Sequence, residues 1–419
     1  MLSERFILFF VTGLIGLRWF GQWVLTRRNQ NHVDAHRSDV PTAFRGLVDA
    51  PTYAKSVEYT LAKARFSHWE CAREAVILGS VLWTGGLAWS WNLWEHHWGT
   101  SSWAQAGWLF AIEIVISIPA IPFEWWEQFR LEEKFGFNTT TFGPWLMDRV
   151  KGFLVAGVIG YPLLVFILKM VGWMGSLWWL WAWLALLGFQ LVMTILAPIL
   201  ILPLFNKFTP LPEGSLRDRL WALGARTGFG AKTILVMDGS KRSRHSNAYF
   251  TGFGRFRKIV LFDTLIAQLT EPELEAVLAH EVGHFKLGHI PKMLIWVAAS
   301  ALAAFGLIGW LSSQTWFVGG FGFPTSPANT VAPVLLLFAL LSGLVTFWFS
   351  PLANYWSRKH EYEADAYAKA AVGGAEPMLG ALRKLSEHNL SNLTPDPWFS
   401  AFYYSHPTLL EREEALRTS

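Results

Sequence analysis

Long apolar segments alternate with polar segments along most of the chain. A membrane-spanning helix needs about 20 predominantly apolar residues. Seven segments meet this requirement approximately, at 5–25, 74–94, 104–123, 152–171, 177–202, 293–312 and 332–350. The pattern predicts a polytopic α-helical membrane protein with seven transmembrane helices, whose polar segments form loops and a soluble part.

The amino-acid composition agrees with this prediction. Hydrophobic residues make up 52% of the 419 residues and charged residues only 16%, whereas soluble proteins contain about 25% charged residues. The net charge of +4 is small and its basic residues gather in particular loops, so we expect no nucleic-acid partner. Cys71 is the one cysteine, which excludes internal disulfides and a cysteine-based zinc site.

Lysine and arginine occur in alternate connections between the apolar segments. They are frequent in 26–73, 124–151, 206–292 and after residue 350, but the connections 95–103, 172–176 and 313–331 contain none. The positive-inside rule therefore places the N-terminus outside, and the long loops and C-terminus in the cytoplasm.

Charged side chains also lie within predicted spans, among them Arg18 in the first span and Glu113 in the third. Charged groups are costly against lipid, so we expect them to face the bundle interior or a water-filled cavity. For Arg18 an equally weighted alternative is a side chain that reaches toward the end of its span.

The polar segment 206–292 has the pattern of a small α/β unit. Helical spacing over 216–227 ends at a glycine, and strand-like runs follow at 233–237, 247–250 and 258–262. A further helix is predicted over 270–289, because Thr270 and Glu273 have the spacing of a capping box.

This last helix carries the sequence His280-Glu281-Val282-Gly283-His284. Its two histidines are one turn apart, so both imidazoles project from one face and can bind one metal ion. Glu281 lies beside them, where it can accept a proton from water. The H-E-x-x-H spacing is typical of zinc hydrolases, in which two ligands and a base converge on one ion.

Zinc in a hydrolase needs a third protein ligand. Metzincin proteases place it at a histidine ten residues after the first, but here that position is Ile290 and the nearby His289 is one residue short. We interpret His289 as an ordinary histidine at the membrane interface.

A better candidate lies on a helix predicted over 357–365. Glu361 and Asp365 are one turn apart on it, so one can bind the metal while the other accepts a hydrogen bond from a ligand histidine. Glu363 falls on another face and is predicted to be solvated. Without the H-E-x-x-H motif, a charged surface helix would be the simpler interpretation.

Together these motifs resemble the type I CAAX prenyl proteases, integral-membrane, gluzincin-like zinc metalloproteases that process isoprenylated proteins. The resemblance covers nearly the whole chain, with matching segments at 131–138, 241–250, 279–284, 357–365 and 404–412. It implies seven transmembrane helices that form a hollow barrel around a water-filled chamber, with a cytoplasmic α/β zinc metalloprotease domain. The corresponding division of the chain is 1–205 for helices 1–5, 206–292 for the H-E-x-x-H segment, 293–350 for helices 6–7 and 351–419 for the C-terminal catalytic segment.

The resemblance also implies roles for individual residues. One Zn²⁺ per chain would be bound by His280, His284 and Glu361, with Glu281 as the general base. Further roles would belong to Asp365, which orients a ligand histidine, to His406, which stabilises the oxyanion, to Arg412 near the metal, and to Asn247 and Ala248, which hold the substrate backbone on an edge strand.

The predicted function is that of a membrane-embedded zinc endopeptidase acting near the C-terminus of isoprenylated proteins. Its partners would be a peptide or protein substrate and the lipid bilayer. Two alternatives stay open: a quality-control membrane protease without prenyl selectivity, and a non-proteolytic membrane scaffold with a structural zinc. The predicted location is the endoplasmic reticulum membrane or a bacterial inner membrane, with the catalytic part in the cytoplasm.

Overall fold

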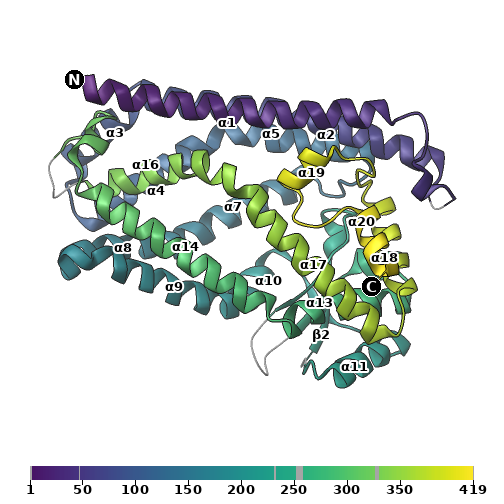
Figure 1. The fold of residues 1–419 in the computed structure, drawn as a ribbon. Helices are drawn as coiled ribbons and strands as arrows, with labels where there is room; N and C mark the ends of the chain where they lie inside the picture. Colours follow the sequence, from purple (N-terminus) through teal and green to yellow (C-terminus); the bar gives the residue numbers. More distant parts are fainter. Residues whose placement is uncertain (1, 47, 231–232, 252–257, 326–329, 419) are drawn as a thin grey trace.

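Most of the chain is helical, and the helices divide into a long bundle and a smaller unit that contains the sheet (Figure 1). The computed structural model describes residues 2–46, 48–230, 233–251, 258–325 and 330–418. The N-terminus lies at the far end of the bundle, and the C-terminus lies in the smaller unit (Figure 1).

The elements follow one another in three groups. The first group is α1 (Leu2–Ala35), α2 (Ala50–Trp83), α3 (Gly86–Trp98), α4 (Ser102–Ser117), α5 (Ile121–Trp126), α6 (Glu133–Phe135), α7 (Phe142–Val155), α8 (Tyr161–Met174), α9 (Trp178–Leu196) and α10 (Leu202–Phe205). The second group is β1 (Phe208–Pro210), α11 (Ser215–Thr227), β2 (Thr233–Met237), β3 (Ala248–Thr251), β4 (Lys258–Phe262), α12 (Asp263–Gln268) and α13 (Glu271–Lys286). The third group is α14 (His289–Ser312), α15 (Thr315–Gly319), α16 (Val331–Thr346), α17 (Ser350–Val372), α18 (Glu376–His388), α19 (Pro397–Tyr403) and α20 (Leu409–Thr418).

Five helical runs among the described residues are long and apolar enough to cross a membrane: Phe6–Ala35, Ser102–Phe135, Phe142–Phe205, His289–Ser312 and Val331–Val372. They contain six of the seven predicted spans, because the third run includes both α8 and α9, which pack against each other. The predicted span 74–94 is instead divided between α2 and α3 at Gly85, whose φ is 67°.

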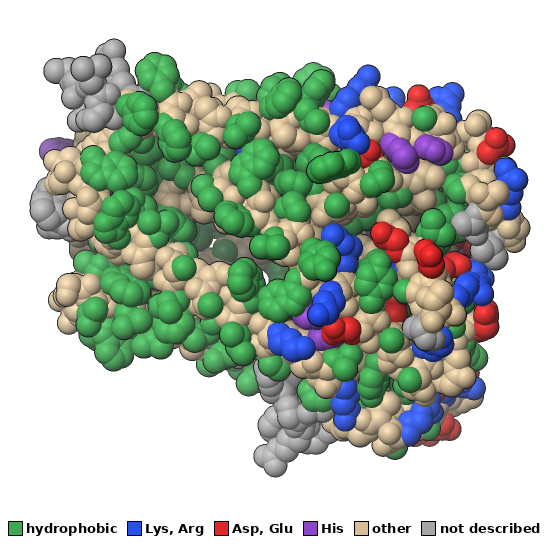
Figure 2. All heavy atoms as spheres, viewed as in Figure 1, with side chains coloured by type: hydrophobic (Ala, Val, Ile, Leu, Met, Phe, Trp, Pro, Cys, Tyr) green, Lys and Arg blue, Asp and Glu red, His purple; other side chains and the backbone are tan. Residues whose placement is uncertain are grey.

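The surface of the molecule also differs between the bundle and the unit that contains the sheet. In Figure 2 the half of the molecule over the bundle is covered by apolar side chains, whereas charged side chains gather over the unit that holds the sheet. A hollow opens among the apolar side chains on this face. Lipid contact accounts for the apolar half, since a protein in water rarely exposes so large a continuous apolar surface.

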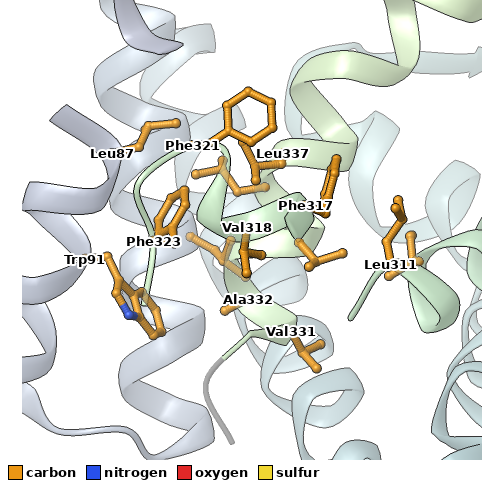
Figure 3. Close-up of a cluster of buried hydrophobic side chains, with 14 of the residues drawn as sticks. Leu87, Trp91, Leu311, Phe317, Val318, Phe321, Phe323, Val331, Ala332 and Leu337 are labelled. Atoms are coloured by element: carbon orange, nitrogen blue, oxygen red, sulfur yellow. The ribbon is translucent and has the colours of Figure 1, made fainter. Parts of the chain in front are cut away.

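A cluster of buried side chains closes the bundle at the end away from the sheet (Figures 1 and 3). Trp91 of α3, Phe317 and Val318 of α15, and Leu337 of α16 belong to this cluster (Figure 3). Trp91 also meets the ring of Trp108 of α4 edge-to-face, with ring centroids 4.9 Å apart. These contacts tie α15 and α16 to the hairpin of α3 and α4.

Charged side chains line a cavity of about 490 Å³ between the bundle helices. Arg18 and Glu113 both face this cavity, and Arg18 Nη2 lies 3.4 Å from Glu74 Oε2. The prediction that charged residues within the spans face the interior is therefore confirmed for these two. Arg18 thus forms an ion pair with Glu74 of α2 at the wall of this cavity.

The smaller unit contains a four-stranded sheet in the order β1-β2-β4-β3. β2 and β4 are parallel, and β1 and β3 pair antiparallel to them at the two edges. The strands at 233–237 and 258–262 and the helix at 216–227 are confirmed, and β3 is shifted by one residue from its prediction. β1 was not predicted, because it has only three residues and ends in a proline.

Helix α13 begins as predicted. The backbone N–H of Thr270 donates to Glu273 Oε2 at 2.7 Å, which completes the capping box. The predicted end at residue 289 is wrong: α13 stops at Lys286, and Gly288 with a φ of 69° turns the chain into α14. His289 therefore begins the next helix and is not part of the H-E-x-x-H helix.

α13 packs closely against α17 at Gly283. A Cβ atom at Gly283 would lie 3.2 Å from the Cα atom of Ala364 and 3.2 Å from the Cβ atom of Tyr367. Ala364 is completely buried at the same contact. The missing side chain of Gly283 thus sets the distance between the two helices.

Replacement of Gly283 by alanine is expected to destabilise the fold by about 1–3 kcal/mol, because the added methyl group forces the helices apart. Thermal unfolding of the detergent-solubilised protein measures the effect. Gly79→Ala on α2 is the matched control, because a Cβ atom there meets nothing within 4 Å. Equal unfolding temperatures for Gly283→Ala and the control would contradict the assigned role of this contact.

Candidate metal centre

Three potential metal ligands meet where α13 crosses α17. His280 Nε2 and His284 Nε2 lie 3.1 Å apart. From α17, Glu361 Oε2 lies 3.4 Å from His280 Nε2, and Glu361 Oε1 lies 3.3 Å from His284 Nε2. His280 and Glu361 are buried, so the cluster is largely removed from water.

The geometry of this cluster fits a zinc ion. Zinc binds imidazole nitrogen and carboxylate oxygen at about 2.0–2.2 Å in a tetrahedral arrangement, which puts ligand atoms about 3.3 Å apart. The three measured separations agree with this value. Glu361 Oε2 is also buried without a hydrogen-bond partner, an unfavourable state that a bound cation would relieve.

Asp365 and Arg412 fix one of the two histidines. His280 Nδ1 donates to Asp365 Oδ1 at 2.8 Å, which leaves the lone pair on Nε2 directed toward the cluster. Arg412 donates to both oxygens of Asp365, from Nε at 2.7 Å and from Nη2 at 2.6 Å. A bidentate pair of this kind holds a buried carboxylate in one orientation.

Glu281 lies beside the cluster and lines a cavity of about 520 Å³ together with His284 and Glu361. Removal from water raises the pKa of the Glu281 carboxyl, against the opposing effect of the neighbouring histidines. A raised pKa suits a general base, which must hold a proton for part of the reaction.

The other residues predicted at the site lie near the metal cluster or on the strand that leads into this cavity. His406 Nε2 is 3.5 Å from Glu361 Oε1, and the imidazole is largely exposed. Ala248 begins the edge strand β3 and Asn247 precedes it; the next two residues of the strand, Tyr249 and Phe250, line the cavity. The seven predicted metal and catalytic residues thus come together, and the predicted substrate strand borders them.

Comparisons with known proteins cover most of the chain. Residues 29–207 match the family described as "CAAX prenyl protease N-terminal, five membrane helices", and residues 210–419 match "Peptidase family M48". The CAAX prenyl protease 1 of Saccharomyces cerevisiae is 36% identical over 409 residues, covering 90% of this chain and 88% of the relative. This chain belongs to the CAAX prenyl protease 1 family.

Relatives from other kingdoms and a crystal structure agree with this assignment. The homologue from Homo sapiens is 32% identical, covering 93% of this chain and 91% of the relative, and that from Oryza sativa is 35% identical over 90% of both. The crystal structure of S. mikatae Ste24p is 31% identical, covers 98% of both chains and has a TM-score of 0.89.

Family membership establishes the class of protein. The chain is an integral multi-pass membrane metallopeptidase of the CAAX prenyl protease type, and membership of peptidase family M48 implies zinc as its metal. The described residues contain a His-His-Glu cluster suited to that ion.

Two predictions for the surroundings of the CAAX prenyl protease centre are wrong. His289 is only 4% exposed, and its Nδ1 lies 3.0 Å from Nδ1 of His284, so it is not an interfacial histidine. Glu363 is only partly solvated, because its Oε2 accepts a hydrogen bond from His289 Nε2 at 2.9 Å. The helix break at Gly288 turns His289 toward His284, and this break could not be distinguished from a continuous helix by spacing alone.

Asp365→Asn is expected to weaken zinc binding by about 10- to 100-fold, because an amide is a poorer partner for the His280 N–H and for Arg412. Competition with a chromophoric chelator measures the zinc affinity. Asp34→Asn, which alters an exposed ion pair with Arg37, is the control and is expected to leave the affinity unchanged. Unchanged affinity in Asp365→Asn would show that this carboxylate does not orient the ligand.

Proposed function

We propose that the chain cleaves peptide bonds close to the C-terminus of isoprenylated proteins, at a zinc ion bound by His280, His284 and Glu361. The observation that carries this proposal is the triangle of ligand atoms with Glu281 beside it, on the wall of a largely apolar cavity. The names of the relatives support the prenylated substrate, since they are CAAX prenyl proteases.

Each catalytic side chain has one task in this proposal. Zinc, when bound, supplies a Lewis acid that polarises a carbonyl group and lowers the pKa of water. Glu281 takes a proton from the attacking water and returns it to the leaving amine. His406, whose exposed imidazole lies 3.5 Å from Glu361, donates a hydrogen bond to the oxyanion. Asp365 and Arg412 hold His280 in the orientation that ligation needs.

The substrate backbone would add to the sheet as a further strand. β3 pairs with β4 on one side and is the last strand of the sheet among the described residues. Strand addition at such an edge gives a peptide several backbone hydrogen bonds without a requirement for sequence. Asn247 precedes this strand and Ala248 begins it, and the next two residues, Tyr249 and Phe250, line the cavity that contains Glu281.

The isoprenyl group would occupy the apolar part of the same cavity. Ile290, Met293 and Trp296 of α14 and Trp356 of α17 line it beside the metal cluster. The rings of Trp296 and Trp356 meet edge-to-face with centroids 5.9 Å apart. An isoprenyl chain bound there would lie next to the bond that is cleaved, and would gain about 25 cal/mol for each Å² of apolar surface removed from water.

We also propose that seven transmembrane helices form a hollow barrel with the catalytic part in the cytoplasm. The alternation of basic and uncharged connections supports this orientation. The charged cavity around Arg18 and Glu113 supports a hydrated interior. The division of the chain into 1–205, 206–292, 293–350 and 351–419 follows from this topology.

Glu281→Gln is expected to abolish peptide cleavage and to leave zinc bound, because glutamine keeps the shape of the side chain but cannot accept the proton. Cleavage of a fluorogenic CAAX peptide and the bound metal content are measured on the same purified sample. Full activity of this variant would falsify the proposed role. Loss of zinc together with loss of activity would instead assign Glu281 to zinc binding.

Trp296→Ala is expected to lower kcat/KM for a farnesylated peptide by roughly tenfold, because a large apolar contact is lost. The rate for the unmodified peptide should change little. Trp310→Ala on the same helix is the control, since Trp310 contacts Trp316 and does not line the cavity. Equal losses for both peptides would place the isoprenyl group elsewhere, and equal wild-type rates for both would favour a quality-control protease without prenyl selectivity.

A further inference from the structure

We infer that His289 and Glu363 form a hydrogen-bonded chain that positions the second zinc ligand, His284. This chain would be the counterpart of Asp365 and Arg412, which hold the first ligand, His280. The inference rests on the proposed function, because it takes His284 to bind zinc through Nε2.

The three residues come from three different helices. His284 lies near the end of α13, His289 is the first residue of α14, and Glu363 lies on α17. His284 Nδ1 is 3.0 Å from His289 Nδ1, and His289 Nε2 is 2.9 Å from Glu363 Oε2. The left-handed turn at Gly288 brings His289 back beside His284, and the imidazole of His289 is buried in this position.

Only one arrangement of protons satisfies both contacts when His284 binds zinc. The lone pair of Nε2 then points to the metal, so the ring hydrogen of His284 is on Nδ1 and donates to His289 Nδ1. His289 therefore carries its own hydrogen on Nε2, which donates to the carboxylate of Glu363. Glu363 thus selects the form of His289 that accepts from His284, and His289 fixes the ring of His284.

The same residues could also be considered as a second metal site, because ligand atoms of His289, His360 and Glu363 lie within 4.8 Å of one another. The ring geometry argues against this. His289 and His360 stack with centroids 4.0 Å apart and an interplanar angle of 10°, so their lone pairs lie in parallel planes and do not converge. Both nitrogens of His289 are already engaged.

The two supports differ in their exposure. Asp365 is buried and held by Arg412, whereas the side chain of Glu363 is 37% exposed and its nearest cation, Lys359, is 4.0 Å away. Loss of Glu363 leaves water free to take its place as an acceptor. Removal of His289 leaves the partly buried N–H of His284 without its partner and its ring free to turn, so we expect His289 to matter more.

The test measures zinc affinity of the full-length protein in detergent by chelator competition, independently of activity. His289→Ala is expected to bind zinc about 10- to 100-fold more weakly. His289→Asn should recover most of the affinity, because its amide oxygen can replace Nδ1 as the acceptor. Glu363→Ala should bind zinc a few-fold more weakly than wild type. Lys359→Ala, one turn away on the same face, should have wild-type zinc affinity. The zinc-free forms of all four should remain folded at the temperature of the affinity measurement, which thermal unfolding checks.

Wild-type affinity in His289→Ala, or an affinity of His289→Asn as low as that of His289→Ala, overturns the inference. Two zinc ions per wild-type chain with only one in His289→Ala would also overturn it and would indicate a second metal site. His280→Ala separates this failure from that of the proposed function. If His280→Ala also binds zinc normally, the metal centre itself is wrong; if it alone loses zinc, only the role of His289 is rejected.

Discussion

The close packing of α13 against α17 is the constraint on which the metal centre depends. His280 and His284 lie on one helix and Glu361 on the other, so the separation of the helix axes determines the separation of the ligand atoms. Gly283 faces Ala364 with room for no larger side chain. The same glycine lies between the two histidines in sequence, so the closest approach of the helices coincides with the metal cluster.

This contact also connects the site to the bundle. α13 is followed directly by α14, and α17 follows α16 through a single 3₁₀ turn. Both metal-binding helices are thus joined over a few residues to helices that are apolar enough to cross a membrane. Their ends bring apolar side chains, including Met293 and Trp356, into the cavity beside Glu281. A centre built in this way can act on a substrate that is partly held by apolar contacts.

The sequence predicted the parts of this structure that depend on local patterns. Of the seven spans predicted from apolar length, six lie in long apolar helices of the structure. The capping box predicted the start of α13, and the spacing of His280 and His284 predicted that they share a face. The position of Glu361 opposite these histidines was predicted from its spacing with Asp365 together with the family resemblance.

The errors arise where tertiary contacts determine the conformation. Glycine at residue 288 is compatible with a helix or a break, and in the structure it adopts a φ of 69° and separates the two helices. His289 and Glu363 then meet across two helices, which no spacing along one helix can reveal. The segment predicted as one span at 74–94 is likewise divided, because Gly85 adopts a positive φ and a new helix begins after it inside the apolar segment.

Burial of charge gives the site its rigidity. Asp365, Glu361 and Arg412 are all buried, and a buried charge without a partner costs several kcal/mol. Arg412 therefore stays bound to Asp365, and Asp365 to His280, because none of them has water as an alternative. His284 has no carboxylate directly behind its Nδ1 and instead contacts the neutral ring of His289. A neutral partner adds no further charge beside the metal cluster, while it still fixes the ring, so the two ligands can be held equally firmly at different electrostatic cost.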